Sequence, residues 1–322
     1  MVVVKTGNKE ISKYLARYIN LDIIEKIASR HSTGGTRPAL DYPSVKNLPI
    51  IEGIDFSPID RAIELKKQKE SEAQQLLDSI DAYILNELRI TLPKINTDLK
   101  SRIFLVNRSE LEARLDPTVY KDGIKLISKN YDNVKLSSVA YVNPTGTFKG
   151  KDIETPISFI PMEAVDEVYA EVSKLEDTTI ENASGFTKFK EGDLLWAKIT
   201  PCMQNGKSAI AKKLTNGLGC GSTEFFVMRS KDERLAIEYL HVILHMKCIR
   251  ETAMLYFGGS AGQQRVSSAF LENFNLPLPS KDKQIEIASH VYALRQKAKV
   301  LKEEGKIILE NTKKEVEQMI IG

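Results

Sequence analysis

The order of hydrophobic and polar positions divides the chain into helical and β-rich stretches. Apolar residues recur at helical spacing over residues 11–31. After Pro58, as far as about Leu92, the chain contains neither Pro nor Gly, and its apolar positions follow a four-three rhythm in a charged background. This pattern predicts a coiled-coil-like helix of about 35 residues, about 50 Å long, with Ser57 as its N-cap and Pro93 ending it.

A second long helix with the same narrow apolar stripe is predicted from Asp282 to the C-terminus, loosened by Gly305. Because a single helix of this kind is marginal in water, two of similar length most simply pack on each other. The apolar positions expected to form this packing, or to contact partners, are Ile63, Leu77, Ile80, Ile84, Ile287, Val291, Leu294, Leu301 and Ile308.

Between the two helices the pattern changes to short β-rich runs: RIFLV, ISFIPM, DLLWAKI and TEFFVMR. Clusters of Gly, Asn, Thr and Pro separate them, and a helix from about Arg234 to Leu255 follows. We therefore expect an α+β fold class, with one globular mixed α/β domain held between two long helices.

An internal repeat relates the two ends of the chain. The stretch STGGTRPALDYPSVKNLPII, from Ser32, aligns without a gap with SAGQQRVSSAFLENFNLPLP, from Ser260. The alignment places Gly34 on Gly262, Arg37 on Arg265, Asn47 on Asn275, Leu48 on Leu276 and Pro49 on Pro277. Each copy leads into a long charged helix, so the repeat unit is a whole domain with its helix. We interpret the chain as the back of one repeat followed by a complete second one.

Composition adds little to this division. The 322 residues are 42% hydrophobic and 28% charged, as in ordinary soluble proteins, and a net charge of +3 is compatible with nucleic acid without indicating it. The three cysteines match neither a zinc ribbon nor a disulfide framework, so we expect reduced thiols. MVVVKTGNKE lacks the apolar run of a signal peptide, and no apolar stretch is long enough to span a membrane. We expect a cytoplasmic protein with no membrane partner.

Candidate enzyme motifs are weak. His241 and His245 have a spacing that a zinc site could use, but no third ligand is evident, which favours histidines satisfied within the fold. Cys202 has no activating partner nearby, which favours a buried thiol. GLGCGS lacks the third glycine of a dinucleotide fingerprint, no P-loop is present, and NPTG at Asn143 falls short of the Asn-Pro-Pro-aromatic site of amino-methyltransferases. We expect no catalytic residue and no metal site.

Three polar stretches favour binding instead: residues 198–211, 219–230 and 257–270. Loops of this composition offer N–H groups to phosphates, and Gln, Asn and Arg side chains can read base edges. From residue chemistry alone, a set of solvated turns is an equal alternative. Trp196 and Phe225 are expected in the core rather than as stacking platforms.

The motifs KITPCMQNGK, GSTEFFVMR and GGSAGQQRV, in this order, resemble the target-recognition domain of the specificity (S) subunit of Type I restriction–modification systems. The entry SRIFLVNRSELEARLDPTVY and the exit NLPLPSKDKQIEIASHV are also similar, so the resemblance covers residues 11–322. It implies alternating recognition domains and long helices, with the two helices packed antiparallel and each domain reading one half of a bipartite DNA sequence.

The front of this chain departs from that pattern, because it has no counterpart of KITPCMQNGK or GSTEF. We therefore expect residues 1–56 to be the remnant of a first recognition domain, exposing a helix face that needs a partner and is open to proteolysis. The other expected boundaries are 57–96 for the first spacer helix, 97–280 for a complete recognition domain and 281–322 for the second spacer helix.

The resemblance also implies a function and partners. The chain is expected to be a non-catalytic subunit that reads one half-site of double-stranded DNA and docks methyltransferase (M) subunits along its helices, with the restriction (R) subunit completing the complex. It would carry no cofactor, because S-adenosylmethionine, Mg and ATP would belong to those partners. A homodimer or a second S chain would restore two readers. The alternatives are a helical scaffold with a protein-binding α+β domain, or an inactive shuffled fragment.

Site residues follow from the same resemblance. Those expected to position phosphate or backbone are Lys198, Thr200, Asn205, Lys207 and Arg265. Those expected as possible base contacts are Gln263, Gln264, Thr145, Thr147, Lys149 and Lys151. Target specificity is expected from residues 144–155 and 171–190, and Glu224 is interpreted as structural, bonding its own loop.

Overall fold

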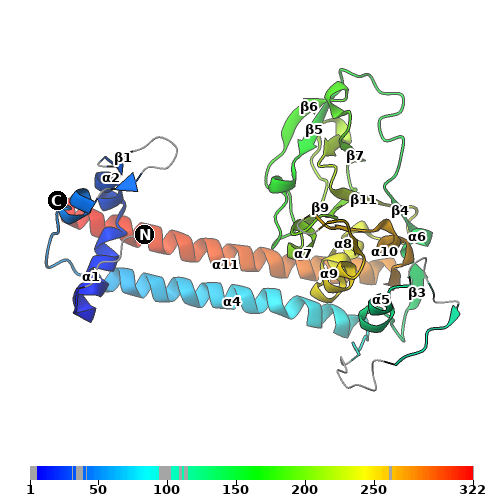
Figure 1. Ribbon diagram of the computed structural model, residues 1–322, viewed down its shortest axis with the longest axis horizontal. Coiled ribbons are helices and arrows are strands. Elements are labelled where there is room, and N and C mark those ends of the chain that lie inside the picture. The colour runs from blue at the N-terminus through cyan, green and yellow to red at the C-terminus, as the bar shows by residue number, and fades with distance from the viewer. Residues whose placement is uncertain are drawn as a thin grey trace. The chain divides into compact units, whose positions relative to one another are not determined.

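The protein divides into two compact units in a computed structural model. The structure describes residues 6–30, 32–33, 39–40, 42–93, 103–108, 111, 115–260 and 263–321. One unit, unit 1, comprises residues 1–77 with 297–322, and the other, unit 2, comprises residues 78–296. Helices α4 (Ser57–Glu87) and α11 (Lys281–Ile321) each contribute to both units (Figure 1). The domain boundaries expected from sequence stay a prediction, and Gly34, Arg37 and Gly262 of the repeat lie outside the described residues.

Unit 1 has its own hydrophobic core. Helices α1 (Lys9–Ile19) and α2 (Asp22–Arg30) pack on the start of α4 and the end of α11. The buried residues of this core are Tyr18, Leu21, Ile24, Phe56, Ile59 and Val316. The helix face that we expected to be exposed is therefore covered by the chain's own long helices. A small hairpin of β1 (Ser32–Thr33) and β2 (Ala39–Leu40), followed by α3 (Tyr42–Lys46), completes the unit.

Within each unit, α4 and α11 pair antiparallel. In unit 1, Lys69 contacts Glu304 at 2.7 Å, and in unit 2, Lys283 contacts Glu87 at 2.6 Å. Gly305 allows a close approach, because a Cβ there would lie 3.3 Å from Lys66 Cα. All nine apolar positions predicted for packing are covered. Ile80, Ile84, Ile287, Val291 and Leu301 are buried, and Ile63, Leu77, Leu294 and Ile308 are half-buried.

The ends of α4 differ from the prediction. The helix ends at Glu87 rather than at Pro93, because Arg89 takes a left-handed backbone with φ of 54°. The N–H of Ile90 then donates to Leu85 O at 2.9 Å, which closes a Schellman motif. At the other end, Ser57 is the first helical residue and not the N-cap, since Phe56 O accepts the first helical bond, from Asp60 N at 3.0 Å.

Unit 2 is built on two four-stranded sheets, ordered β6-β5-β10-β7 and β4-β11-β8-β9. The strands are β4 (Ala140–Val142), β5 (Pro156–Ile160), β6 (Glu176–Thr179), β7 (Thr187–Lys190), β8 (Leu194–Ala197), β9 (Ser208–Ile210), β10 (Leu218–Gly221) and β11 (Phe225–Ser230). Only the β5–β10 pair is parallel among the strand pairs of these sheets that the structure describes. One buried cluster draws side chains from both sheets, among them Ile160, Phe189, Leu195 and Phe225. Gly219 is required beside it, because a Cβ there would lie 2.4 Å from the Phe189 ring.

Two predicted elements of unit 2 are wrong. Residues 103–106, the described part of the run RIFLV, form no strand, and Leu105 is fully exposed. The helix predicted from Arg234 to Leu255 is instead two helices, α8 (Ile237–His245) and α9 (Lys247–Met254). Met246 breaks it with an extended ψ of 139°, which frees His245 O to accept from Arg250 Nε at 3.1 Å.

Around the sheets lie several short elements. They are α5 (Pro117–Asp122), β3 (Asp132–Lys135), α6 (Leu136–Val139), α7 (Cys202–Asn205), β12 (Phe257–Gly258), β13 (Arg265–Val266), α10 (Ser268–Asn273) and β14 (Asn275–Leu278). Strand β14 pairs with β3, and β12 pairs with β13. Among the described residues, no helix combines the length and apolar character that crossing a membrane requires.

The sequence repeat is also a repeat of structure. Two helices, a two-stranded hairpin, a short helix and the Asn-Leu-Pro segment precede α4, and the same order precedes α11. In the first copy Tyr18 Oη donates to Pro49 O at 2.9 Å, and in the second Tyr239 Oη donates to Pro277 O at 2.6 Å. The two prolines occupy equivalent positions, so each copy ties its first helix to the segment before its long helix.

Candidate nucleic-acid interface

Three loops predicted to contact DNA meet in unit 2. The Lys198 N–H donates to Glu224 O at 2.9 Å, and Lys198 O accepts from Val266 N at 2.9 Å. The Thr200 N–H donates to Gln264 O at 3.0 Å. Main-chain bonds thus fasten the start of KITPCMQNGK to both GSTEFF and GQQRV. These bonds bring Lys198, Thr200 and Gln264 together, as one shared site requires.

Arg265 is held by a carboxylate within this junction. Its Nη2 lies 2.7 Å from Glu224 Oε1, and its Nε donates to Oε2 at 2.9 Å. The hydrogen bond from Arg265 lowers the pKa of Glu224, so the carboxylate is ionised at neutral pH. The Arg265 side chain is still 42% exposed, which leaves part of it open to an incoming group. Glu224 is structural as predicted, but it bonds the GQQR loop rather than its own.

A hollow of about 440 Å³ lies beside this junction. We call it the threonine hollow. It is lined by Asn143, Pro144, Thr145, Gly146, Thr147, Phe186, Thr187, Lys188, Lys198, Phe225 and Val227. Thr147 Oγ1 is enclosed and has no hydrogen-bond partner among the described residues. The hollow therefore joins the loop after β4 to the start of β7 and to Lys198.

Asn143 and Phe148 anchor the walls of the threonine hollow. Asn143 Oδ1 accepts from Val227 N at 3.1 Å, which pins the start of the loop after β4. Phe148 packs against a buried cluster that includes Ile157, which holds the middle of this loop on the sheet. Lys188 Nζ lies 5.6 Å above the Phe148 ring, so the Lys188 side chain is ordered by the same anchor.

The lining of the threonine hollow suits a polyanion with hydrogen-bonding edges. Hydroxyl groups of Thr145, Thr147 and Thr187 can donate or accept, and the ammonium groups of Lys188 and Lys198 carry positive charge. Phosphate oxygens take such donors, and base edges take both donors and acceptors. The ring of Phe186, which also lines the hollow, is 41% exposed and offers a face on which a base can stack.

Sequence reasoning missed Phe186, Thr187 and Lys188 as individual residues and gave only the range 171–190. One signal could have found Lys188. In the strand TKFK, side chains alternate between the two faces of the sheet, so the buried Phe189 places Lys188 on the opposite face.

Of the other predicted residues, Gln263 adjoins this junction, where its O accepts from Arg265 Nη1 at 2.9 Å. Lys207 Nζ donates to Met162 O at 3.1 Å and to Val165 O at 3.0 Å, and Asn205 Nδ2 donates to Glu167 Oε2 at 3.2 Å. Both residues thus fasten another loop of unit 2. Lys149, Lys151 and Gln263 are exposed. Contacts of all five with DNA stay predictions.

His241 and Cys220 are buried, but the burial expected for Cys202 is wrong. The two ring nitrogens of His241 lie 3.1 Å from Ser208 Oγ and 2.9 Å from Tyr292 Oη, and burial lowers the pKa of His241 to about 3. Burial raises the pKa of the Cys220 thiol to about 11. Cys248 is also buried, whereas Cys202 is only half-buried. No group of three or more His, Cys, Asp or Glu in the described part of the chain is placed to hold a metal ion.

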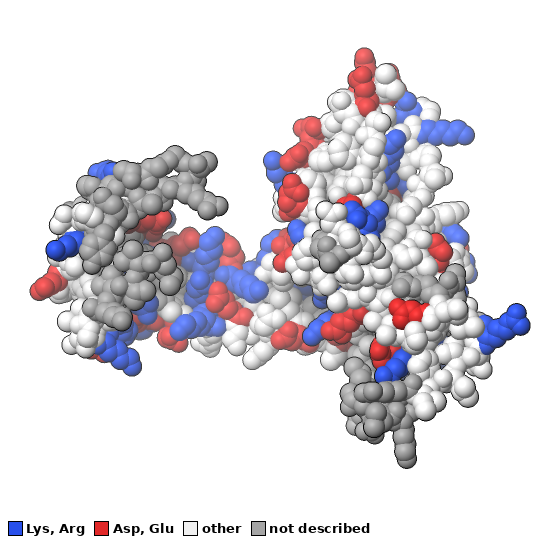
Figure 2. All heavy atoms as spheres, in the orientation of Figure 1, with Lys and Arg blue, Asp and Glu red and all other residues white. Residues whose placement is uncertain are grey.

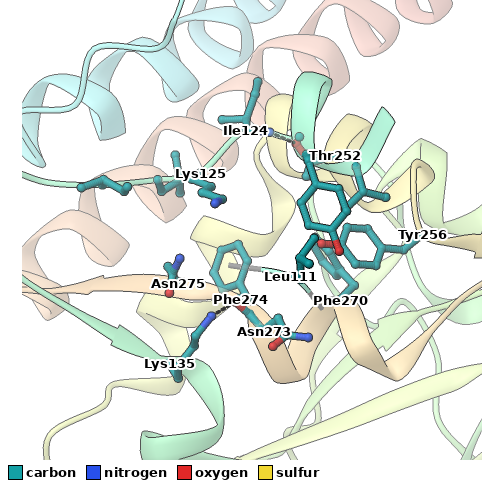
Figure 3. A pocket seen from close by; sticks show the side chains of 15 residues that line it. Leu111, Ile124, Lys125, Lys135, Thr252, Tyr256, Phe270, Asn273, Phe274 and Asn275 are labelled. Atoms are coloured by element: carbon teal, nitrogen blue, oxygen red, sulfur yellow. Dashed lines mark hydrogen bonds between the residues drawn. The ribbon is translucent and has the colours of Figure 1, made fainter. Parts of the chain in front are cut away.

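A second cavity, of about 360 Å³, contains none of the predicted DNA-binding residues (Figure 3). Its wall includes the rings of Phe270 and Phe274, whose centroids are 5.8 Å apart. Lys135 Nζ, at its edge, donates to Asn273 O at 2.8 Å, so this ammonium group is engaged within the unit. Figure 2 shows basic and acidic side chains interspersed over the visible face, in keeping with the net charge of +3.

Known proteins share much of this sequence. Residues 128–311 match the family described as Type I restriction modification DNA specificity domain. The EcoEI specificity subunit of a Type I restriction enzyme of Escherichia coli is 33% identical over 168 residues, and its EcoAI counterpart is 35% identical over 157. These alignments cover 50% and 47% of this chain and 27% and 26% of the relatives, so the chain spans about a quarter of their length.

A solved structure is similar as well. The HsdS subunit from Thermoanaerobacter tengcongensis aligns with 94% of this chain and 67% of its own length, at 14% identity and a TM-score of 0.44. The family match alone covers more than half of the chain. It includes Lys198 and the residues bonded to its main chain, Glu224 and Val266. The chain therefore belongs to the family of Type I restriction modification DNA specificity domains.

Proposed function

We propose that this protein is a DNA-recognition subunit of a Type I restriction–modification complex, in which unit 2 reads one half-site of duplex DNA. Its relatives from Escherichia coli bear the name of specificity subunits of such enzymes. The chain itself is non-catalytic. Methyltransferase subunits dock along the paired long helices, and they bring S-adenosylmethionine, while Mg and ATP belong to the restriction step.

One observation carries this proposal: the junction of three loops at Lys198 beside the threonine hollow. Within one site it gathers the ammonium groups of Lys188 and Lys198, three threonine hydroxyls and the guanidinium of Arg265. Lysine and arginine position a protein on the DNA backbone, while hydroxyls and a ring inside a hollow can select a base. A protein-binding scaffold would have no need for this combination.

Duplex binding by two lysine variants tests the proposal. We expect Lys188→Met and Lys198→Met each to weaken binding across all sequences and to reduce the slope of log affinity against log salt by about one, because each ammonium neutralises one phosphate. Lys129→Met is the matched control, since Lys129 is exposed and does not line the threonine hollow. Binding is measured by fluorescence anisotropy at several salt concentrations.

The same variants are then assembled with a Type I methyltransferase subunit, and methylated adenines are mapped across a host genome. If the parent chain pairs with a second copy, the methylated sequence should be an interrupted palindrome. The two variants should then methylate it less than the parent. Salt-independent binding, or equal effects of all three substitutions, would support the scaffold alternative. Absence of any new methylation would support an inactive fragment.

A further inference from the structure

Arg295 carries a buried charge that has no ion-pair partner among the described residues. Its side chain projects from α11 into the interior of unit 2 and is only 3% exposed. Neither Nε nor Nη1 has a hydrogen-bond partner among the described residues. Burial lowers the pKa of Arg295 to about 10, so the guanidinium is still protonated at neutral pH. Buried charges are costly unless they are paired, so this one calls for a counter-charge.

Among the described residues, no carboxylate lies within ion-pair distance of Arg295. His241 is neutral at pH 7, because burial lowers its pKa to about 3. Arg250 adds a second cation whose field acts on Arg295. The charge of Asp81 raises the pKa of Arg295 from a distance. Its Oδ2 accepts from Lys247 N at 2.9 Å, and burial raises the pKa of Asp81 itself.

A cavity of about 580 Å³ reaches Arg295. Its lining includes three basic side chains, Lys212, Lys213 and Arg295, and one acidic side chain, Glu171, which leaves a net charge of +2. Among the described residues, the ion pair of Lys212 is a long contact of 3.9 Å to Glu238. Tyr292 completes this wall with its hydroxyl, which is bonded to His241. The cavity is therefore electropositive, and its size suits a small molecule.

We propose that this cavity binds a small dissolved phosphate-type dianion, with the Arg295 guanidinium as its main anchor and Lys212 and Lys213 at its rim. A doubly charged anion balances the net charge of +2, and a guanidinium matches phosphate oxygens with two parallel donors. Because Arg295 is 3% exposed, an ion or a small phosphate ester can approach it more closely than the backbone of a duplex can.

The test uses the full chain with inorganic phosphate as the probe, by isothermal titration calorimetry at constant ionic strength. We expect saturable binding that Arg295→Met weakens at least tenfold. Methionine has a similar length without the charge, so Arg295→Met should leave the Tm unchanged or raised when phosphate is absent. The matched control is Arg234→Met, which removes the same charge from a side chain that is 58% exposed and paired with Asp232. It should bind phosphate like the parent.

Two further measurements distinguish free phosphate from the phosphates of a DNA backbone, and allow for a variant that does not fold. If a DNA backbone supplied the anion, Arg295→Met would weaken duplex binding as much as it weakens phosphate binding, and this outcome overturns the proposal. Should Arg295→Met fail to fold, the double variant Lys212→Met with Lys213→Met must weaken phosphate binding severalfold. An unchanged Kd in either variant, or no saturable binding by the parent, rejects the site.

Discussion

At the scale of single residues, the charged side chains at the loop junction are held in place before any ligand arrives. Lys198 Nζ lies 5.6 Å above the Phe226 ring, Lys188 lies over Phe148, and Arg265 is paired with Glu224. Side chains that are already ordered lose less conformational entropy on binding. This arrangement gives Glu224, an acidic residue, a role in the candidate site: it orients Arg265 while leaving part of the guanidinium exposed.

The pair predicts a pH-dependent effect of Glu224→Gln. Arg265 lowers the pKa of Glu224 in the folded state, so the pair stabilises the fold above the ordinary glutamate pKa and this contribution is lost as the pH falls through the lowered value. We expect Glu224→Gln to lower the Tm by about 1–2 °C at pH 7, because an exposed ion pair is weak. The difference from the parent should shrink toward pH 3. Calorimetry measures it, with Glu154→Gln, at an exposed position, as the control. A difference that is independent of pH would contradict the assigned ionisation.

Residue chemistry predicted part of the site and could not predict the rest. The polar composition of their loops singled out Lys198, Thr200 and Gln264, the family resemblance gave them a role, and the structure brings them together. Lys207 has the same composition around it, yet its ammonium group faces two carbonyls of another loop. Arg295 lay in a helix whose charged positions all look solvated in the sequence. Its burial depends on the sheets and on α8, which no local pattern reports.

At the scale of elements, periodicity was most informative where it was long. The two helices of 31 and 41 residues and the β-rich runs from Ile157 to Arg229 were predicted from sequence. RIFLV has the composition of a strand, but a strand also needs a neighbour, and Ile103 is 86% exposed. The break at Met246 and the end of α4 depend on single backbone angles that apolar spacing does not encode.

The left-handed backbone of Arg89, just after α4, leads to a prediction about stability. Its φ of 54° is costly for a residue with a side chain and free of cost for glycine. We expect Arg89→Gly to raise the free energy of unfolding by about 0.5–1 kcal/mol, measured by urea denaturation. The same change inside α4, Arg61→Gly, should lower it by about 1 kcal/mol, because glycine weakens a helix interior. Equal losses in both variants would mean that the left-handed turn at Arg89 does not form in solution.

At the scale of the whole molecule, the two units have separate hydrophobic cores. The core of unit 1 joins Tyr18, Leu21 and Ile24 of the N-terminal segment to Val316 near the end of α11. The core between the sheets of unit 2 contains none of these residues. The N-terminal helices are thus held by the far end of the chain. This non-local contact is why the sequence led us to expect an exposed helix face.

The dependence of the N-terminal helices on Val316 can be tested by limited proteolysis with mass spectrometry. Val316 is 3% exposed, so Val316→Asp places an unpaired carboxylate among apolar side chains. We expect α1 and α2 to be cleaved early in this variant, while residues 115–260 stay as resistant as in the parent because their core is intact. Ile307→Asp on the same helix is the control, since Ile307 is already 45% exposed. Early cleavage of α1 and α2 in the parent would show that they are a loose remnant, and loss of resistance across 115–260 in Val316→Asp would show that the two cores unfold as one.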